Sequence, residues 1–140
     1  YGKSEMICHG TGGKKNGVLL FAVGSMVETA VLVREILLQE KGIDATVVNA
    51  RFAQPFDAEM LDRELSEHRL LVTMEENVRS GGFGEHVLEF MNTNGDGSME
   101  VLNIAIPDVY VEHGNVELLR KETGIDADGI IGKIIDRKAQ

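Results

Sequence analysis

Six consecutive apolar residues, Val18–Val23 (VLLFAV), constrain the fold of this chain more than any other feature of its sequence. A strand that is apolar without alternation is buried on both faces, which is typical of a parallel sheet covered by helices on both sides. Shorter strands are expected at Ala45–Asn49, Leu70–Met74 and Val101–Ile106, and segments with helical periodicity separate them. Because strands and helices alternate, we predict a single three-layer α/β/α domain over residues 1–140, with a mostly parallel sheet.

The segment Met26–Glu40 is predicted to be a helix with an unusually wide apolar surface. Ser25 is expected to cap its start, because a serine hydroxyl can accept a free backbone N–H, and Gly42 is expected to end it. A helix that lies on a sheet needs an apolar arc of about 100°, and this one has more. Its narrow polar stripe consists of Glu28, Glu35 and Gln39. We therefore expect a second surface to cover this helix.

Two further helices are predicted, one before and one after the strand Leu70–Met74. Asp57 is expected to cap the helix Ala58–Glu67, in which Leu61 and Leu65 face inward. Its polar positions, expected to face water, are Glu59, Asp62, Arg63 and Glu64. The helix Phe83–Met91 follows that strand, and its buried side is expected to consist of Val87, Leu88 and Met91.

The ends of the chain are predicted to add an edge strand and two helices. Glu5–His9 fits a short edge strand, and the glycine-rich segment Gly10–Gly17 fits a hairpin turn better than a phosphate loop, because the spacing of glycine and lysine is wrong for one. A short helix is expected from Asn115 through Glu122, and a last one from Asp126. The apolar stripe of that last helix consists of Ile130, Ile131, Ile134 and Ile135.

Charge and composition argue against nucleic acids and membranes as partners. The net charge is −9, and such an excess of acid repels nucleic acids and anionic membrane surfaces. No apolar run approaches the ~20 residues of a membrane-spanning helix. A single cysteine, Cys8, fits a reducing cytoplasm and is expected to be a small apolar residue of the edge strand. The first residue is Tyr1 rather than Met, which suggests a segment of a longer protein.

The stretch Leu70–Gly84 combines a strand, acidic residues, a glycine-rich turn and the start of a helix. Turns of this kind lie at the carboxyl ends of strands, where open α/β sheets bind ligands and partners. Glu75 and Glu76 resemble an acid/base pair, but adjacent strand residues point to opposite faces and would not share a substrate. We therefore predict hydrogen bonding or ion pairing at a domain contact for these residues. The candidate contact residues are Glu75, Glu76, Asn77, Ser80, Gly81, Gly82 and His113.

Two interpretations of the turn Ser80–Gly84 stay open. Free N–H groups at the start of the following helix could hold an anion, for which Arg79 is available. Glycines also permit the backbone of a neighbouring domain to approach closely, and we favour this contact.

The histidines offer few sites by spacing alone. None of the histidines has a zinc-type spacing in the sequence to the cysteine or to another histidine. His113 follows the last predicted strand and is the best single polar candidate. The remaining three are His9, His68 and His86. We predict no catalytic, cofactor-binding or metal-binding residue in this chain.

Five motifs, spread over nearly the whole chain, carry a family resemblance. They are Tyr1–Glu5 (YGKSE), Val23–Val27 (VGSMV), Ala50–Asp57 (ARFAQPFD), Thr73–Gly84 (TMEENVRSGGFG) and Leu102–Gly114 (LNIAIPDVYVEHG). In this order they resemble the C-terminal domain of the 1-deoxy-D-xylulose-5-phosphate synthases, which are transketolase-like enzymes. The glutamate–glycine turn alone would fit any transketolase-type C-terminal domain. The segment Pro107–Gly114 and the tail Thr123–Ile130 narrow the resemblance to the synthase. The glycine-rich insert Cys8–Gly17 departs from the family pattern.

The resemblance implies a five-stranded mixed sheet whose first strand is antiparallel to the rest. It implies a cytoplasmic, homodimeric parent enzyme that condenses pyruvate with glyceraldehyde 3-phosphate and releases carbon dioxide, in non-mevalonate isoprenoid biosynthesis. Thiamine diphosphate and Mg²⁺ would act in the parent's other two domains, which carry the cofactor motifs. The chain would then be a non-catalytic structural domain whose partners are those two domains. The alternatives are the same domain of another thiamine-diphosphate enzyme (a transketolase or a 2-oxo acid dehydrogenase component) and a stand-alone flavodoxin-like ligand-binding module.

Overall fold

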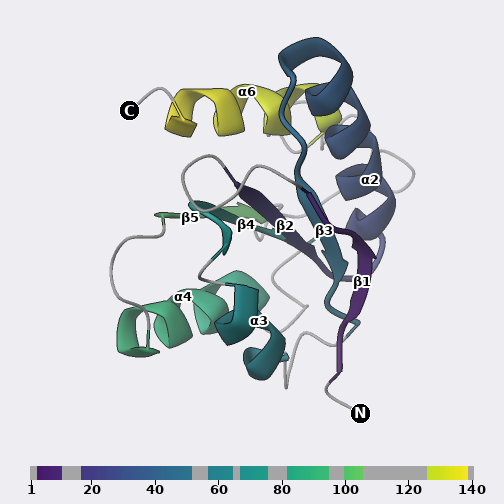
Figure 1. Cartoon of the computed structure of the whole chain (residues 1–140). Coiled ribbons are helices and arrows are strands. Elements are labelled where there is room, and N and C mark those ends of the chain that lie inside the picture. The colour runs from purple at the N-terminus through teal and green to yellow at the C-terminus, as the bar shows by residue number, and fades with distance from the viewer. Residues whose placement is uncertain are drawn as a thin grey trace, which may run out of the picture.

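The structure, a computed structural model, contains a five-stranded sheet with helices on both faces (Figure 1). It describes residues 3–10, 17–51, 57–64, 67–75, 82–94, 100–105 and 126–138. The strands are β1 (Glu5–Cys8), β2 (Val18–Ala22), β3 (Thr46–Asn49), β4 (Leu70–Glu75) and β5 (Glu100–Ala105). The helices are α2 (Met26–Ile36), α3 (Ala58–Glu64), α4 (Phe83–Asn94) and α6 (Ala127–Lys138). A π-helical turn, η1 (Leu37–Lys41), continues α2.

The strand order is β1-β3-β2-β4-β5, and β1 alone among these strands runs antiparallel to its neighbour. The predicted mixed sheet with an antiparallel first strand is therefore confirmed. The four parallel strands start along one side of the sheet, which we call the amino edge, and end along the opposite side, the carboxyl edge. These two terms refer to the ends of the strands and not to the outermost strands β1 and β5. Because β1 is antiparallel, its last residue, Cys8, pairs with Val47 near the start of β3. His9 and Gly10, which follow β1, thus lie at the edge where the parallel strands begin.

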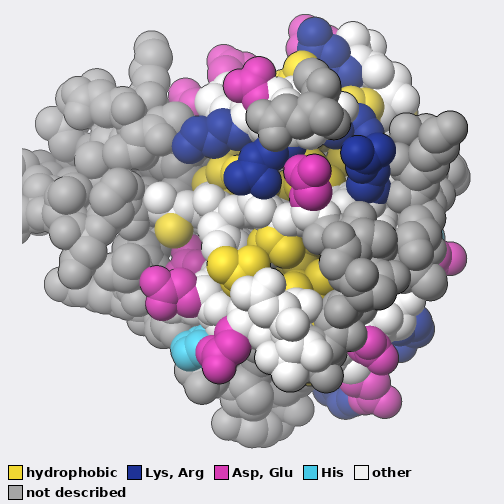
Figure 2. Space-filling model, turned by 90° about the vertical axis from the view of Figure 1, so that its left-hand side faces the viewer, with side chains coloured by type: hydrophobic (Ala, Val, Ile, Leu, Met, Phe, Trp, Pro, Cys, Tyr) yellow, Lys and Arg dark blue, Asp and Glu magenta, His cyan; other side chains and the backbone are white. Residues whose placement is uncertain are grey.

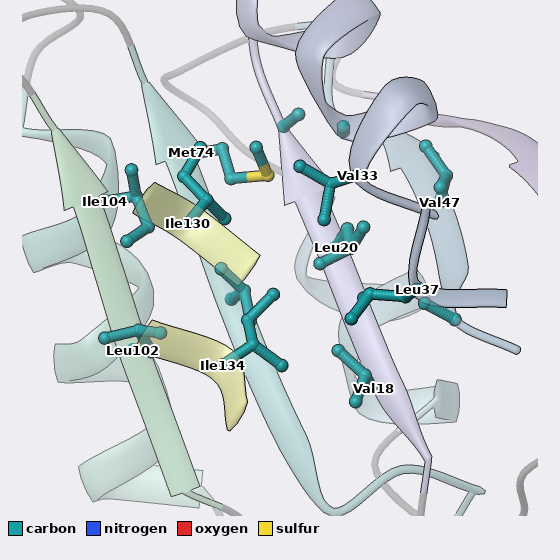
Figure 3. Packing of buried hydrophobic residues seen from close by; sticks show 14 of the residues in the cluster. Val18, Leu20, Val33, Leu37, Val47, Met74, Leu102, Ile104, Ile130 and Ile134 are labelled. Atoms are coloured by element: carbon teal, nitrogen blue, oxygen red, sulfur yellow. The ribbon is translucent and has the colours of Figure 1, made fainter. Parts of the chain in front are cut away.

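The core has two layers, one on each face of the sheet (Figure 1). β2 is completely buried, and its residues alternate between the two layers, as the continuous apolar run predicts. Leu20 packs with Val33 of α2 and Ile130 of α6 in the layer shown in Figure 3. Phe21 and Phe83, with ring centroids 5.1 Å apart, belong to the other layer, which α3 and α4 cover.

The helix α2 has a second apolar neighbour besides the sheet, because α6 packs against it. Part of the expected covering surface is therefore α6, while the side chains of Leu32 and Leu38 remain 51% and 41% exposed. Gly42 ends the helical segment with φ of +67°, as predicted. The expected cap is wrong in detail: Ser25 makes no side-chain capping bond, and the Val27 N–H donates to the Gly24 carbonyl (3.2 Å).

The predicted cap of α3 and the predicted start of the last helix at Asp126 are confirmed. The Asp57 Oδ1 accepts the N–H of Met60 (3.1 Å), and the Asp126 Oδ1 accepts the N–H of Gly129 (2.9 Å). The isoleucine stripe of α6 is confirmed as well, with Ile130 and Ile134 fully buried.

Two predicted orientations are wrong. Leu88 was expected to be buried but is 37% exposed, because Val87 and Met91 already fill the inner side of α4. Glu64 was expected to face water but is only 5% exposed, because α3 turns its last residue toward the end of β1. The predictions for Leu65, for the turn of residues 11–16 and for the helix Asn115–Glu122 lie outside the described residues.

The edge strand β5 is partly covered by α6. The guanidinium of Arg137 donates to the Val101 carbonyl (3.1 Å), a bond that occupies one of the free groups of the strand edge. Figure 2 shows this side of the molecule, where Lys and Arg side chains gather next to a hydrophobic patch. None of the helices described is long and apolar enough to cross a membrane.

Candidate functional site

Glu75, the last residue of β4, lies at the edge where the parallel strands end. Its side chain is buried, with 4% exposure for the residue, although most carboxylates are exposed. The Oε2 atom accepts the backbone N–H of Gly84 over 2.6 Å. That N–H belongs to the first turn of α4, whose donors have no partner within the helix. The carboxyl group of Glu75 therefore ties the end of β4 to the start of α4.

Small residues permit this contact between strand and helix. Gly82 has φ of +65°, a left-handed conformation that glycine adopts without strain. A Cβ atom on Gly84 would lie 3.0 Å from both Thr73 Oγ1 and Asn103 Cγ, so the first turn of α4 packs directly on the sheet. The Thr73 hydroxyl donates to Asn103 Oδ1 over 2.6 Å beneath it. A side chain at position 84 would therefore crowd Thr73 and Asn103, which glycine avoids.

Burial raises the pKa of Glu75 above its ordinary value of 4.5 and outweighs the opposite effect of the backbone N–H groups of Gly84 and Phe83. The negative charge of Glu85 raises this pKa further, and His86 lowers it. The second oxygen, Oε1, has no hydrogen-bond partner among the residues that the structure describes. A buried carboxyl group with one satisfied oxygen can accept one more donor or hold a proton.

The structure places only part of the predicted contact set. Glu75 and Gly82 lie at this edge, and the hydrogen bond of Glu75 joins it to a helix of its own domain. The other candidates, Glu76, Asn77, Ser80, Gly81 and His113, lie outside the described residues. A role for these residues in a domain contact stays a prediction.

The Glu75 carboxyl group also bears on the anion interpretation of the turn. An anion at a helix start binds the free N–H groups of the first turn. The N–H of Gly84 already donates to Glu75 Oε2, so a group of the chain itself takes this donor. This donor is therefore not available to an anion in the structure.

A second polar cluster lies at the opposite edge, where the parallel strands begin. His9 follows β1, Glu64 ends α3, and His68 precedes β4. The His9 Nε2 atom lies 3.2 Å from Glu64 Oε2 and 2.9 Å from Glu67 Oε2. Potential ligand atoms of His9, Glu64 and His68 all lie within 4.8 Å of one another.

The ring of His68 is fixed by hydrogen bonds on both nitrogens. Nδ1 lies 2.9 Å from the Glu64 carbonyl, which can only accept, so Nδ1 carries the proton. In the neutral ring, Nε2 then accepts the hydroxyl proton of Thr46 over 2.7 Å. The Thr46 Oγ1 in turn accepts the N–H of Gly10 over 2.8 Å.

The electrostatics of this second cluster favour a positive charge. Burial lowers the pKa of His9, but the hydrogen bond to Glu67 and the charge of Glu64 outweigh it, so this pKa lies above its ordinary value of 6.5. The hydrogen bond to His9 lowers the pKa of Glu67 below its ordinary value of 4.5. Two carboxylates thus face one imidazole.

Sequence reasoning missed this cluster, because it searched for histidines and cysteines at short zinc-type spacings. His9 and Glu64 are 55 residues apart, and only the sheet brings them together. One signal was present in the sequence, since Glu64 and His68 have the spacing of four residues that joins side chains across a helical turn.

The fold and the glutamate–glycine turn together define the class of protein. The family model described as "Transketolase, C-terminal domain" matches residues 12–130, and the chain belongs to this family. Within it, the chain is 49% identical over 96% of its length to a 1-deoxy-D-xylulose-5-phosphate synthase of Lachnoclostridium phytofermentans. It is 42% identical over 99% of its length to the synthase of Pelotomaculum thermopropionicum. The chain spans about a fifth of these relatives, 20% and 21% of their lengths.

Solved structures agree with this placement. A split-gene transketolase, solved as an inactive β4 tetramer, superposes with a TM-score of 0.79 at 25% identity, covering 96% of this chain and 42% of that one. A transketolase from Pichia stipitis superposes with a TM-score of 0.60 at 14% identity, covering 99% of this chain and 18% of that one, and shows the shared fold. The resemblance identified from the sequence motifs is therefore confirmed.

Proposed function

We propose that this chain serves as the C-terminal domain of a 1-deoxy-D-xylulose-5-phosphate synthase. The observation that carries the proposal is the 49% identity over 96% of this chain to an enzyme of that name. The parent enzyme would join pyruvate to glyceraldehyde 3-phosphate with loss of carbon dioxide, using thiamine diphosphate and Mg²⁺. The parent is proposed to be a cytoplasmic homodimer.

The described residues do not fit thiamine diphosphate. The start of α4 could receive a phosphate group, but its Gly84 N–H donates to Glu75 Oε2. Among the described residues, the His–Glu cluster able to hold a metal lies at the other edge of the sheet. We therefore assign no step of the reaction to this chain and propose a structural role for it.

The proposed role is to hold the other domains in place through the edge around Glu75. The buried carboxyl group fixes the start of α4 against β4, and the glycine turn precedes that helix directly. The carboxyl ends of parallel strands are where open α/β sheets meet ligands and partners, which makes the start of α4 a suitable contact surface for a neighbouring domain. The other two domains of the parent are the proposed partners.

Enzyme activity tests the non-catalytic role. The 140-residue chain, supplied with pyruvate, glyceraldehyde 3-phosphate, thiamine diphosphate and Mg²⁺, is expected to form no product. A full-length synthase assayed in parallel is the positive control. Turnover by the chain alone, in a preparation free of other synthases, would refute the structural role.

Calorimetry separates this proposal from a stand-alone ligand-binding module. A module would bind phosphate-bearing metabolites at the glycine turn, whereas a structural domain gives no heat with them. Glu75→Gln supplies a control for any heat observed, because it alters the edge at which such a ligand would bind. Saturable binding that this substitution weakens would favour the module.

A further inference from the structure

The strand β1 differs from the other strands in what attaches it to the domain. It is an outermost strand, and β3 is its one strand partner among the described residues (Figure 1). None of the described residues 3–10 is buried, and none of them belongs to either layer of the core. The side chains of Met6 and Ile7 are 39% and 38% exposed. Burial of apolar surface therefore contributes little to holding β1 in place.

The outermost strand on the other side of the sheet, β5, is attached differently. Leu102 and Ile104 are 8% and 2% exposed and belong to the core layer that α6 covers. β5 also pairs with β4 in a continuous register, whereas the register of β1 on β3 shifts between Met6 and Cys8. A shift of this kind disrupts the ladder of hydrogen bonds locally. An outermost position alone therefore does not explain the weak apolar attachment of β1.

Polar contacts with the start of α3 hold the residues before β1. The backbone N–H and the hydroxyl of Ser4 both donate to Asp57 Oδ2, over 3.0 Å and 2.9 Å. The other oxygen of the same carboxylate caps α3. Lys3 and Glu59 form an ion pair at 2.9 Å, but both side chains are largely exposed, and such pairs contribute little. Asp57 is therefore the main attachment of this segment at the carboxyl edge.

A second set of polar contacts holds the residues after β1 at the amino edge. The Nε2 atom of His9 lies 3.2 Å from Glu64 Oε2 and 2.9 Å from Glu67 Oε2. The N–H of Gly10 donates to Thr46 Oγ1 over 2.8 Å. The segment thus runs alongside α3, with one of its ends at the start of that helix and the other at its end.

We propose that residues 3–10, which we call the strap, detach from β3 and α3 as a unit while both layers of the core stay intact. The strap is attached by polar contacts at both ends, and none of its apolar side chains is buried. Water replaces these polar contacts when the strap leaves, so opening costs far less than unfolding the core. The domain therefore has a partly open state that lies below global unfolding in free energy.

The strap has a consequence for the proposed parent enzyme. The other two domains precede a C-terminal domain in sequence, so β1 is the described element that follows them first. Release of the strap would let those domains move without opening the core of this one. This consequence rests on the proposed function, whereas the strap itself depends only on the contacts within the chain.

Hydrogen exchange of the 140-residue chain, followed by NMR in increasing urea, tests the proposal. The β1 amides that bond β3 are expected to exchange at least about 100-fold faster than the amides of β2. Their exchange should respond little to urea, because detachment exposes little surface. Equal protection and equal urea dependence of β1 and β2 would overturn the proposal. Complete absence of protection in β1 would overturn it too, because the strap would then not be held at all.

A substitution in the core separates local opening from global unfolding. Ile134→Val removes one methyl group from a fully buried side chain of α6. The core around it stays packed when only the strap detaches. Exchange in β2 should therefore become about fivefold faster, while exchange in β1 stays unchanged. An equal change in both strands would show that β1 leaves only when the core unfolds, and would overturn the proposal.

Substitutions in the strap test the contacts that hold it. Ser4→Ala removes one of two bonds to Asp57 and leaves the cap of α3 in place, so exchange in β1 should become about tenfold faster. Gly10→Ala would place a Cβ atom against the Asp44 carbonyl oxygen, closer than real atoms approach, and should have a larger effect. Lys3→Ala, which removes an exposed ion pair, is the control with little effect.

Unchanged β1 exchange in both Ser4→Ala and Gly10→Ala, with folding verified by circular dichroism, would overturn the proposal. None of these measurements depends on synthase activity. A failure of the strap would therefore leave the proposed function untouched, and a failure of the proposed function would leave the strap untouched.

Discussion

The two edges of the sheet each bury one glutamate, but they satisfy it differently. At the carboxyl edge, Glu75 accepts a backbone N–H from the start of α4. At the amino edge, Glu64 faces the imidazoles of His9 and His68. A backbone N–H is held in place by the fold and does not titrate, whereas an imidazole can take up or release a proton near neutral pH. The comparison teaches that a buried acid can be satisfied by a backbone group at one edge and by side chains remote in sequence at the other.

The largest expected effect comes from removing the acid of the carboxyl edge. Glu75→Ala should lower the free energy of unfolding by about 3 kcal/mol, because it removes a charge-capable acceptor from the Gly84 N–H and leaves a void. Urea denaturation measures the change. The control is Glu85→Ala on the exposed side of α4, expected to stay within about 0.5 kcal/mol. Equal losses for both variants would show that Glu75 does not tie α4 to β4.

A somewhat smaller loss is expected from the amino edge. Thr46→Val should cost about 2 kcal/mol, since valine keeps the shape but removes the partner of both Gly10 N–H and His68 Nε2. Urea denaturation again gives the value. Thr93→Val is a matched control with a near-neutral expectation, because the Thr93 hydroxyl donates to the Glu89 carbonyl on the exposed surface of α4. A neutral Thr46→Val would mean that His68 is not oriented through this hydroxyl.

Packing at the carboxyl edge is tested by a methyl group. Gly84→Ala should cost about 1 kcal/mol, because the new Cβ would lie 3.0 Å from Thr73 Oγ1 and Asn103 Cγ. Gly132→Ala in α6 is the control, since no atom of the described residues lies within 4 Å of its Cβ position. Alanine there should stabilise the helix by about 0.5–1 kcal/mol. Thermal unfolding of the two variants should therefore shift in opposite directions, and a common direction would contradict this packing.

The smallest effect is a dependence of stability on pH that differs between the edges. The pKa of Glu75 is raised in the folded state, so its contribution is fully present below pH 4.5 and is lost as pH rises through the folded value. The pKa of His9 is also raised, so its contribution is present below pH 6.5 and is lost above that. Glu75→Gln should remove the fall in unfolding free energy that begins above pH 4.5, and His9→Gln should remove the fall that begins above pH 6.5.

Unfolding free energies measured across both windows check this separation. Glu67 has a lowered pKa that depends on His9, so His9→Gln also removes a contribution that is present above pH 4.5 and lost below it. The change in unfolding free energy above pH 6.5 therefore tests the contribution of His9 separately from that of Glu67. Identical pH profiles of both variants would contradict the separation of the two edges.

The order of the elements could be predicted because it depends on local periodicity. The apolar run at Val18 gave a doubly buried strand, and all five strands lie where the pattern placed them. The chemistry of single residues predicted that Gly42 ends the helical segment that starts at Met26 and that Asp57 caps α3. These features need no knowledge of distant parts of the chain.

The candidate site was predictable only in part. Glu75 was singled out because acids and glycines gather after a strand, and its observed hydrogen bond is to a helix of its own domain, while the predicted contact with another domain stays a prediction. The identity of its partner, the N–H of Gly84, could not be predicted, because it depends on how α4 packs against β4. Glu64 was misplaced, because a glutamate on a short amphipathic helix is usually exposed and the chain that covers it, at His9, is remote in sequence.

The sequence by itself determined the class of fold, the alternation of strands and helices and the family, since hydrophobic period and short motifs carry that information. Tertiary structure decided which polar groups meet. The antiparallel pairing of β1 with β3 brings His9 to the edge where α3 ends and β4 begins. A strand that ran the other way would place His9 at the opposite edge, away from Glu64 and His68. The direction of one edge strand thus determines whether these residues can form a site at all.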